Sequence, residues 1–300
     1  MTVPKLSVVV IAYNMARELP RTLRSLSPAM QRDIAAEDYE IIVVDNGSTE
    51  PFDQAECRLW GGNVSFHALA GATASPARAI NHGLALARGE VVGVCIDGAR
   101  MATPRLLATA LEAARLHRRP VIGTLAFHLG PDIQKRSVVH SGYCQQVEDD
   151  LLASIDWVAD AYRLFGISVF GGSSADGWFV LPAETSALFL ACDHLAELGG
   201  YDENFVMPGG GLVNLDTWAR ACADPAGRAI LLLGEATFHQ FHGGVVTSSS
   251  ASKWPEFHAE YVKIRGCDFK RPEGTPLLVG RLSPEALATI KSSAEHLLKR

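Results

Sequence analysis

Two short apolar runs near the start of the chain constrain its fold most strongly: SVVVIAYN at residues 7–14 and YEIIVVDNGSTE at residues 39–50. Each run is rich in β-branched residues and stops at polar, turn-forming residues, which is typical of a buried strand. Between them, Leu19, Leu23 and Leu26 recur at i, i+4 and i+7, the apolar stripe of a helix lying on a sheet. The order strand, helix, strand predicts polar residues at the carboxyl edge of a sheet, where open α/β sheets bind ligands.

The alternation of strands and helices continues through the first half of the chain. The pattern predicts a helix over residues 75–90, a buried strand over 91–97, a helix from 104 to 117 and a strand over 121–127. We therefore expect an α/β fold with a mostly parallel central sheet flanked by helices.

Composition excludes several broad classes of protein. The net charge of −6 disfavours a general nucleic-acid-binding surface, which needs a basic patch. The six cysteines include no C-x-x-C pair, so neither a zinc site nor a disulfide scaffold is expected. The first apolar run is too short for a signal peptide, and no run approaches the roughly 20 apolar residues that span a bilayer. We therefore expect a cytoplasmic protein without a transmembrane segment, with an oligomer left open.

Five segments in a fixed order resemble a family 2 glycosyltransferase with the GT-A fold. They are VVVIAYN, IIVVDNGST, ARAINHGLALARGEVVGVCID, LGGYDENF and LDTWAR, and they span about residues 5–245. The resemblance implies an enzyme that transfers a sugar from a nucleotide-diphosphate donor to a hydroxyl acceptor, such as a glycan. It further implies metal assistance, a UDP-sugar as the commonest donor and inversion at the anomeric carbon.

This resemblance sets the expected domain organisation. Residues 1–248 form the glycosyltransferase domain, with a nucleotide-binding half over about 1–127 and an acceptor-binding half over 128–248. Residues 249–300 are expected to form a helical tail, and a serine run near 248 marks the boundary.

The resemblance also implies which residues bind the donor nucleotide. The carboxylate of Asp45 would accept a hydrogen bond from the ring N–H of uracil or a similar base. The alternative role for Asp45 is that of a turn residue at the end of a strand. Tyr13 would cover the face of the base, and Arg78 would reach the nucleotide from the first turn of its helix. The expected donor-binding residues are Ala12, Tyr13, Asn14, Asp45, Arg78, Asp97 and Arg100.

The segment CIDGARM departs from the family's metal-binding pair of aspartates. Asp97 keeps the first carboxylate position, but Ala99 takes the second. Two interpretations stay open: a histidine completes a Mn²⁺ or Mg²⁺ site, or Arg100 takes over part of the phosphate neutralisation. For the first, TFHQFHGG offers His242, with His239 as the second choice. On a continuing strand these two residues would face opposite sides, so that only one would point at the site.

The expected catalytic base is a second departure. In the family this base is an aspartate of an acidic pair, which falls here on Val213 and Asn214. An asparagine cannot take a proton, so Asp216 is the expected base and Asp202 the second candidate. Asp216 equally fits a helix-start carboxylate stabilised by the helix dipole.

The loop FGGSSADGW at residues 170–178 is expected to line the acceptor site. The ring of Trp178 would stack on a sugar, and Asp176 would bind sugar hydroxyls. Packing in the core is the alternative for Trp178.

Two other functions remain alternatives at this stage. A catalytically degenerate relative that binds a nucleotide sugar or a glycan would account for the missing second aspartate and for Asn214. A nucleotidyltransferase uses a similar nucleotide site, but residues 7–20 lack the glycine-rich phosphate loop with a basic residue that this class normally shows.

Overall fold

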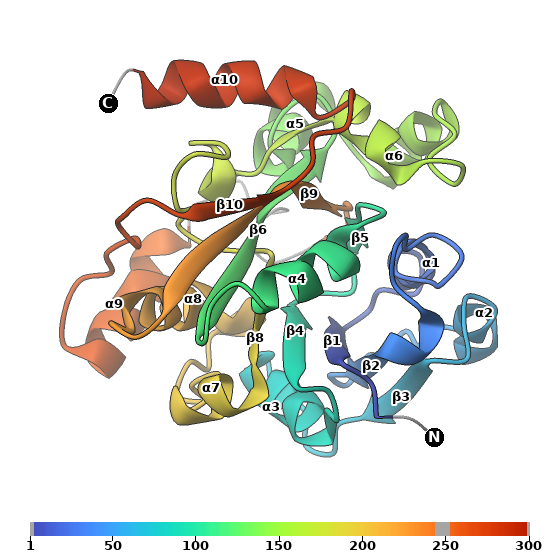
Figure 1. The fold of residues 1–300 in the computed structure, drawn as a ribbon. Helices are drawn as coiled ribbons and strands as arrows, with labels where there is room; N and C mark the ends of the chain where they lie inside the picture. Colours follow the sequence, from blue (N-terminus) through green and yellow to red (C-terminus); the bar gives the residue numbers. More distant parts are fainter. Residues whose placement is uncertain (1–2, 244–252, 299–300) are drawn as a thin grey trace.

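The computed structural model describes residues 3–243 and 253–298. In this part of the chain, one ten-stranded sheet runs through the molecule in the order β10-β9-β6-β8-β4-β1-β2-β3, with β5 paired to β9 and β7 paired to β6. Helices lie on both sides of the sheet (Figure 1). The expected α/β fold with a central sheet flanked by helices is confirmed.

The bounds of the elements are as follows. The strands are β1 (Leu6–Ala12), β2 (Tyr39–Asp45), β3 (Val64–Ala68), β4 (Val91–Cys95), β5 (Arg100–Ala102), β6 (Pro120–Leu129), β7 (Ser168–Phe170), β8 (Ala187–Ala191), β9 (Arg228–His239) and β10 (Leu277–Gly280). The α-helices are α1 (Leu19–Ser25), α2 (Gln54–Arg58), α3 (Ala77–Leu86), α4 (Leu106–Ala114), α5 (Gln134–Ser141), α6 (Gln145–Ala153), α7 (Cys192–Glu197), α8 (Val213–Ala223), α9 (Trp254–Arg265) and α10 (Leu287–Leu297). The 3₁₀ helices are η1 (Ala36–Asp38), η2 (Ala161–Ile167), η3 (Gly172–Ser174) and η4 (Pro208–Gly210).

The first strands form a parallel unit whose carboxyl ends meet at one edge. β1 pairs in parallel with β2, with Ala12 opposite Asp45, and with β4, with Val10 opposite Cys95. The turns that follow these strands therefore lie side by side, as the sequence pattern predicts.

The sheet is mostly parallel but mixed. β8 lies between β4 and β6 and runs antiparallel to both of them. Four of its five residues are buried, so its sequence is continuously apolar, like that of the parallel strands beside it. Strand direction therefore could not be read from the apolar pattern alone.

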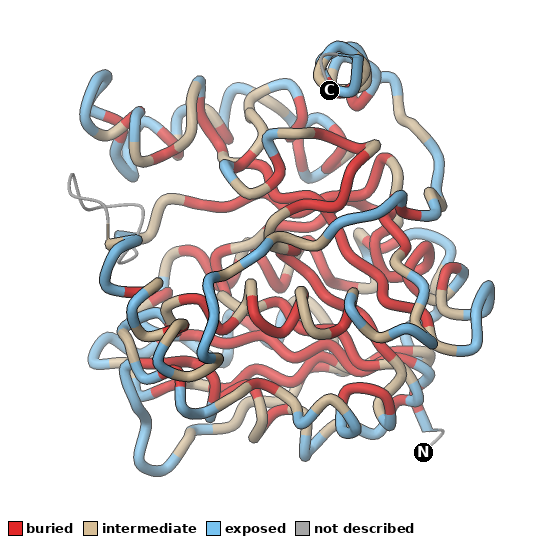
Figure 2. Tube along the Cα trace, turned by 90° about the vertical axis from the view of Figure 1, so that its left-hand side faces the viewer, coloured by how far each residue is buried: buried red, intermediate tan, exposed pale blue. Residues whose placement is uncertain are grey.

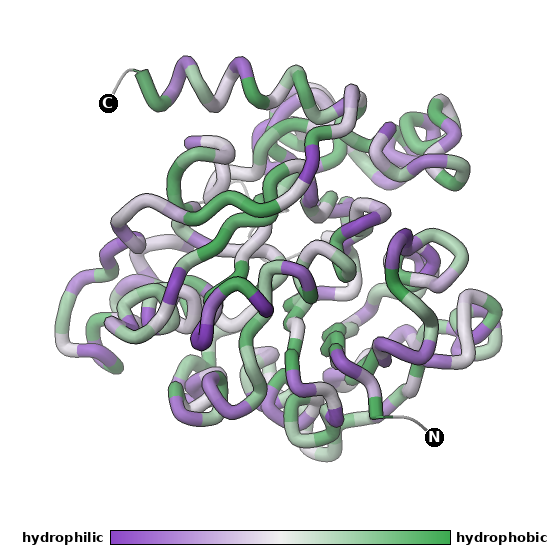
Figure 3. Tube along the Cα trace, viewed as in Figure 1, coloured by the Kyte–Doolittle hydropathy of each residue, from purple (hydrophilic) through white to green (hydrophobic). Residues whose placement is uncertain are grey.

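Alternate residues of β1 enter two different cores. Val8 and Val10 pack with α1 and α4 on one face, whereas Val9 and Ile11 pack with α3 and α9 on the other. Figure 2 shows the buried residues gathered along the strands, with exposed residues on the surrounding loops and helices. In Figure 3 the outer helices alternate apolar and polar residues, as expected for helices with one face on the protein.

The last part of the chain continues the same sheet. The segment expected to be a helical tail contains α9 and α10, but also β10, which pairs in parallel with β9 and places Leu277 opposite Ile230. β10 has four residues, none of them fully buried, so its sequence pattern is too short to indicate a strand. The expected boundary near residue 248 lies outside the described residues. Within residues 3–243 and 253–298, we find no helix with the length and apolar character that crossing a bilayer requires.

Candidate active site

A cavity of about 1200 Å³ opens at the carboxyl edge of the parallel strands. The turns after β1, β2 and β4 contribute Tyr13, Asn46 and Asp97 to its lining. The second half of the chain contributes the segments before β8, at the start of α8 and at the end of β9. The start of α9 completes the wall with Lys253 and Trp254. One cavity therefore joins residues that are more than 200 positions apart.

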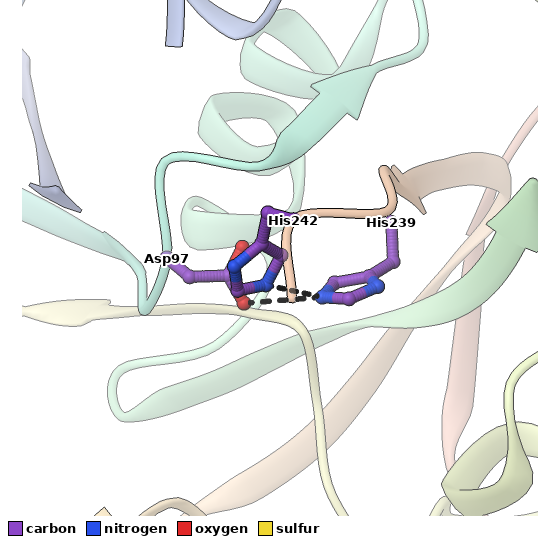
Figure 4. Close-up of side chains that lie close together, drawn as sticks. All are labelled: Asp97, His239 and His242. Carbon is purple, nitrogen blue, oxygen red and sulfur yellow. Dashed lines mark hydrogen bonds and ion pairs between the residues drawn. The ribbon is translucent and has the colours of Figure 1, made fainter. Parts of the chain in front are cut away.

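Three side chains in this wall could hold a metal ion. The ligand atoms of Asp97, His239 and His242 all lie within 4.8 Å of one another. Nε2 of His239 is 3.8 Å from Oδ2 of Asp97 and 3.2 Å from Nε2 of His242 (Figure 4). One carboxylate oxygen and two imidazole nitrogens form a donor set that suits a transition metal such as Mn²⁺ better than Mg²⁺.

The expectation that only one histidine faces the site is wrong. β9 ends at His239, and the chain leaves the extended conformation over the next residues, so the alternation of a continuing strand no longer applies at His242. Both rings therefore turn toward Asp97 (Figure 4). The sequence identified the three residues but not their geometry.

The buried ring of His239 is oriented by Gln134 at the start of α5. The side-chain NH₂ of Gln134 donates to the carbonyl oxygen of His239 at 2.8 Å, so its Oε1 is the atom that accepts from Nδ1 of His239, at 2.7 Å. This contact places the proton on Nδ1 and leaves the lone pair of Nε2 directed at the cluster. Burial, together with the positive charge of Arg100, holds the pKa of His239 well below its usual range. The ring is therefore neutral, as a metal ligand must be.

Arg100 adds a positive group to the same cluster. β5 pairs with β9 so that Arg100 lies opposite His239, and its Nε donates to Oδ2 of Asp97 at 3.0 Å. Its Nη1 is buried and has no partner within the described residues, although Arg100 lines the cavity. A buried guanidinium N–H without an acceptor is costly, and a phosphate oxygen would satisfy it. The histidines and Arg100, weighed as alternatives from the sequence, thus lie together around Asp97.

The expected donor-binding residues divide into two groups. Tyr13, Asn14, Asp97 and Arg100 line the cavity. Tyr13 is 51% exposed although it lines the cavity, so it is accessible to a ligand there. Oδ1 of Asn14 accepts hydrogen bonds from the backbone N–H groups of Thr49 and Glu50, so Asn14 also holds the turn after β2 in place.

Ala12, Asp45 and Arg78 lie outside the cavity lining. Asp45 accepts a hydrogen bond from the backbone N–H of Ser48 at 2.8 Å, which is the turn role weighed as its alternative. Arg78 is exposed and donates to the carbonyl oxygen of Gly71. The neighbouring Asn46 lines the cavity instead, and its buried Oδ1 has no partner within the described residues. Asn46 is a polar group that the sequence interpretation did not select.

Neither expected base reaches the cavity. Asp216 is 1% exposed, and its two carboxylate oxygens accept from Arg265 at 2.6 and 2.7 Å and from Arg220 at 2.8 Å. Asp202 pairs with Arg265 at 2.8 Å. Partial burial raises the pKa of Asp202, but the backbone N–H of Asn204 and the Arg265 guanidinium lower it by more. Through Arg265, these carboxylates attach α9 to the core. This role depends on an arginine about 50 or more residues further along the chain.

Two carboxylates, Asp97 and Glu184, line the cavity within the described part of the chain. Glu184 is half-buried in the segment before β8, and its Oε1 accepts from Nδ2 of Asn214 at 2.7 Å. The sequence interpretation missed Glu184. The available signal was a lone carboxylate in the stretch LPAETSALFLA, directly before a buried strand.

Of the loop expected at the acceptor site, Gly172 and Ser173 line the cavity, whereas Trp178 and Asp176 lie elsewhere. Trp178 is fully buried, and its Nε1 donates to Oγ1 of Thr289 on α10 at 2.7 Å. Asp176 pairs with Arg271 and with His296. The expectation that they line the acceptor site is not supported, because both contact the last part of the chain, whose position the sequence does not indicate. The aromatic residues that line the cavity near α9 are Trp254, Phe257 and Phe269.

Comparison with known proteins connects this geometry to a family. Residues 7–136 match the family model of glycosyl transferase family 2. These residues include β1 to β6, and so they contain Tyr13, Asp97 and Arg100. No curated protein matches the sequence significantly.

Solved structures share the fold over nearly the whole chain. The crystal structure of S. aureus TarS 1-349 in complex with UDP-GlcNAc has a TM-score of 0.54 at 16% identity, covering 98% of this chain and 71% of that one. The mannosyltransferase PcManGT from Pyrobaculum calidifontis, in complex with GDP-Man and Mn²⁺, has a TM-score of 0.52 at 17% identity, covering 99% of this chain and 71% of that one.

The chain spans less than half of the longer TarS structure to which it is similar. The crystal structure of S. aureus TarS has a TM-score of 0.53 at 16% identity and covers 89% of this chain, but this chain covers 40% of that one. At such identities the likeness shows the fold, which is the GT-A fold of these glycosyltransferases. The match over residues 7–136 shows that this part of the chain is similar to family 2 glycosyltransferases, and the chain as a whole shares the GT-A fold of the structures above.

Proposed function

We propose that this chain transfers a glycosyl group from a nucleotide-diphosphate-sugar donor to a hydroxyl acceptor, with a divalent cation held by Asp97, His239 and His242. The observation that carries this proposal is the convergence of these three ligands within 4.8 Å in the wall of the large cavity. Mn²⁺ is the cation we propose, since it accepts imidazole ligands beside a carboxylate more readily than Mg²⁺ does and is the cation in the PcManGT complex.

The bound cation would neutralise the charge that develops on the leaving diphosphate. Two residues position the groups that would bind the cation and the diphosphate. Gln134 keeps the Nε2 lone pair of His239 available, and the unpartnered Nη1 of Arg100 offers a hydrogen bond to a phosphate oxygen. Tyr13 covers the base at the cavity mouth. Because Gln134 holds His239 and Asp97 holds Arg100, these two groups need little rearrangement when charge develops.

The ligands of two structural neighbours support the choice of donor. TarS 1-349 is in complex with UDP-GlcNAc, and PcManGT with GDP-Man and Mn²⁺. We propose a UDP-sugar as the first donor to test and GDP-mannose as the second. A direct displacement of the diphosphate by an acceptor hydroxyl inverts the anomeric carbon, and we propose this outcome. The acceptor would enter beside Glu184, Trp254 and Phe257, which line the cavity.

Thermal unfolding with UDP-GlcNAc and with GDP-mannose, each with and without Mn²⁺, tests the proposal. A donor that binds the folded state raises the melting temperature by mass action. We expect a rise that requires Mn²⁺ in the wild type and that is lost in His239→Ala. His140→Ala is the matched control, because His140 is exposed and lies outside the cavity lining.

Release of the nucleoside diphosphate distinguishes transfer from binding alone. We expect slow, Mn²⁺-dependent release with water as the acceptor. Binding without any release, with both donors, would favour the degenerate binding protein that Asn214 suggested. The absence of both binding and release would overturn the proposal.

A further inference from the structure

The cavity lacks a base at the position where the family resemblance places one. Asn214 occupies that position, and both aspartates considered in its place lie outside the cavity. A deprotonating group must nevertheless lie within hydrogen-bond reach of the acceptor hydroxyl. This group must therefore be one of the side chains that line the cavity.

The chemistry of the lining leaves few candidates. Asp97 is committed to the metal cluster and Arg100. His128 accepts the backbone N–H of Gln134 through Nδ1, so its proton lies on Nε2. With the Nδ1 lone pair of His128 occupied and its Nε2 protonated, neither ring nitrogen is free to accept a further proton. Glu184 is then the remaining carboxylate among the described lining residues.

Glu184 is held in a defined orientation. Nδ2 of Asn214 donates to its Oε1 at 2.7 Å, and Oε2 has no hydrogen-bond partner within the described residues. An oxygen that is buried in part and left without a donor is suited to accept the proton of a ligand hydroxyl. Burial raises the pKa of Glu184, and Asp97 adds to this effect, whereas Arg100 and Asn214 lower it in part. A carboxylate with a raised pKa is the stronger proton acceptor.

We propose that Glu184 is the general base of the glycosyl transfer and that Asn214 is its positioning residue. In this assignment Asn214 occupies the position of the family's base and orients the carboxylate. Glu184 supplies the carboxylate itself, from the segment before β8. The proposal rests on the glycosyl transfer proposed above. It explains how a chain with an asparagine at position 214 remains competent for catalysis.

The step balances without any further reactant. The acceptor O–H bond breaks, and its proton passes to Oε2 of Glu184. The acceptor oxygen forms the new bond to the anomeric carbon as the bond from that carbon to the phosphate oxygen breaks. The electron pair of the broken bond leaves with the nucleoside diphosphate, and Glu184 later releases its proton to water.

Glu184→Gln tests the assignment, because it removes the base but keeps the volume and an oxygen for Asn214 to bind. The probes are UDP-GlcNAc and GDP-mannose with Mn²⁺, with water as the acceptor. We expect the donor Kd to stay within about threefold of the wild type, while nucleoside diphosphate release falls about 100-fold or more. Glu90→Gln is the matched control, since Glu90 is exposed and lies outside the cavity lining.

Rescue by azide distinguishes a variant that has lost its base from one whose site is disrupted. The azide anion needs no deprotonation, so it should restore nucleoside diphosphate release by Glu184→Gln and yield a glycosyl azide. Asn214→Ala should lower the rate of nucleoside diphosphate release with water about tenfold. With azide, the release rate of this variant should return to that of the wild type. A merely structural role for Asn214 would reduce the rates with water and with azide alike.

The outcomes separate this inference from the proposed function. If the wild type releases nucleoside diphosphate and Glu184→Gln retains that rate within threefold, Glu184 is not the base, although the transferase proposal stands. Loss of release in Glu184→Gln that azide does not restore would also overturn the inference. If the wild type neither binds nor cleaves either donor, the proposed function fails first.

Discussion

Gln134 binds His239 at two points, donating to its carbonyl oxygen at 2.8 Å and accepting from its ring Nδ1 at 2.7 Å. The pair joins the start of α5 to the end of β9. Partners of this kind fix the orientation of a metal-binding imidazole, and their loss typically weakens metal affinity.

Gln134→Ala should therefore weaken Mn²⁺ binding by about 10- to 100-fold. Titration calorimetry with Mn²⁺ on the apo protein measures this effect directly. Gln146→Ala is the control, because Gln146 is exposed and bonds Asp150 on the outside of α6. An unchanged Mn²⁺ affinity in Gln134→Ala would contradict the role assigned to this contact.

Trp178→Phe should reduce the stability of the protein without changing its affinity for the donor. The substitution removes the hydrogen bond from Nε1 to Thr289 and leaves space in a fully buried site. We expect the free energy of unfolding to fall by about 1–3 kcal/mol. Urea unfolding measures this loss, and calorimetry with UDP-GlcNAc should give an unchanged Kd. A weakened donor affinity at unchanged stability would restore Trp178 to the binding site.

Asp216→Asn should destabilise the protein rather than remove a base. The buried carboxylate accepts from both Arg265 and Arg220, so neutralising it leaves two guanidinium groups without their counter-charge. Because both arginines are partly exposed, we expect a loss of about 2–4 kcal/mol in the free energy of unfolding. The rate of nucleoside diphosphate release per folded molecule should stay near that of the wild type. A stable variant without activity would show that Asp216 is the base after all.

Glu235 makes stability depend on pH. It is fully buried, with its Oε1 2.6 Å from the hydroxyl of Tyr162, and burial raises its pKa from 4.5 to about 7. The folded state therefore binds a proton more tightly than the unfolded state does. The resulting stabilisation is fully present below about pH 4.5 and is lost as the pH rises through about 7.

Glu235→Gln should remove this dependence, because the amide stays neutral at every pH. Relative to the variant, the wild type should lose up to about 3 kcal/mol of unfolding free energy between pH 4.5 and 8. Urea unfolding at several pH values measures the difference, with Glu90→Gln as the surface control. Parallel curves for the wild type and Glu235→Gln would exclude this effect.

The first half of the fold was accessible from the sequence because its signals are local. Runs such as residues 39–45 and 91–95 carry both the strand pattern and the polar stop that positions the site. That Asp97 lies beside the two histidines was expected from a family resemblance, which supplies the long-range information that a pattern lacks.

The missing parts depend on contacts between distant segments. Trp178 becomes a core residue because α10 covers it, and Asp216 is neutralised by an arginine on α9. Glu184 gains its position from Asn214, thirty residues away. None of these pairings produces a periodic pattern in the sequence. The sequence therefore shows which side chains have suitable chemistry, but not which of them lie in the cavity.

β10 pairs with β9, and Lys253 and Trp254 form part of the cavity wall. This arrangement has a consequence for protein engineering. Shortening the chain at residue 248 would uncover the outer edge of β9 and the indole of Trp178, and would deprive Asp216 of Arg265. Such a truncation would yield an aggregation-prone fragment with an opened pocket, in place of a minimal catalytic unit.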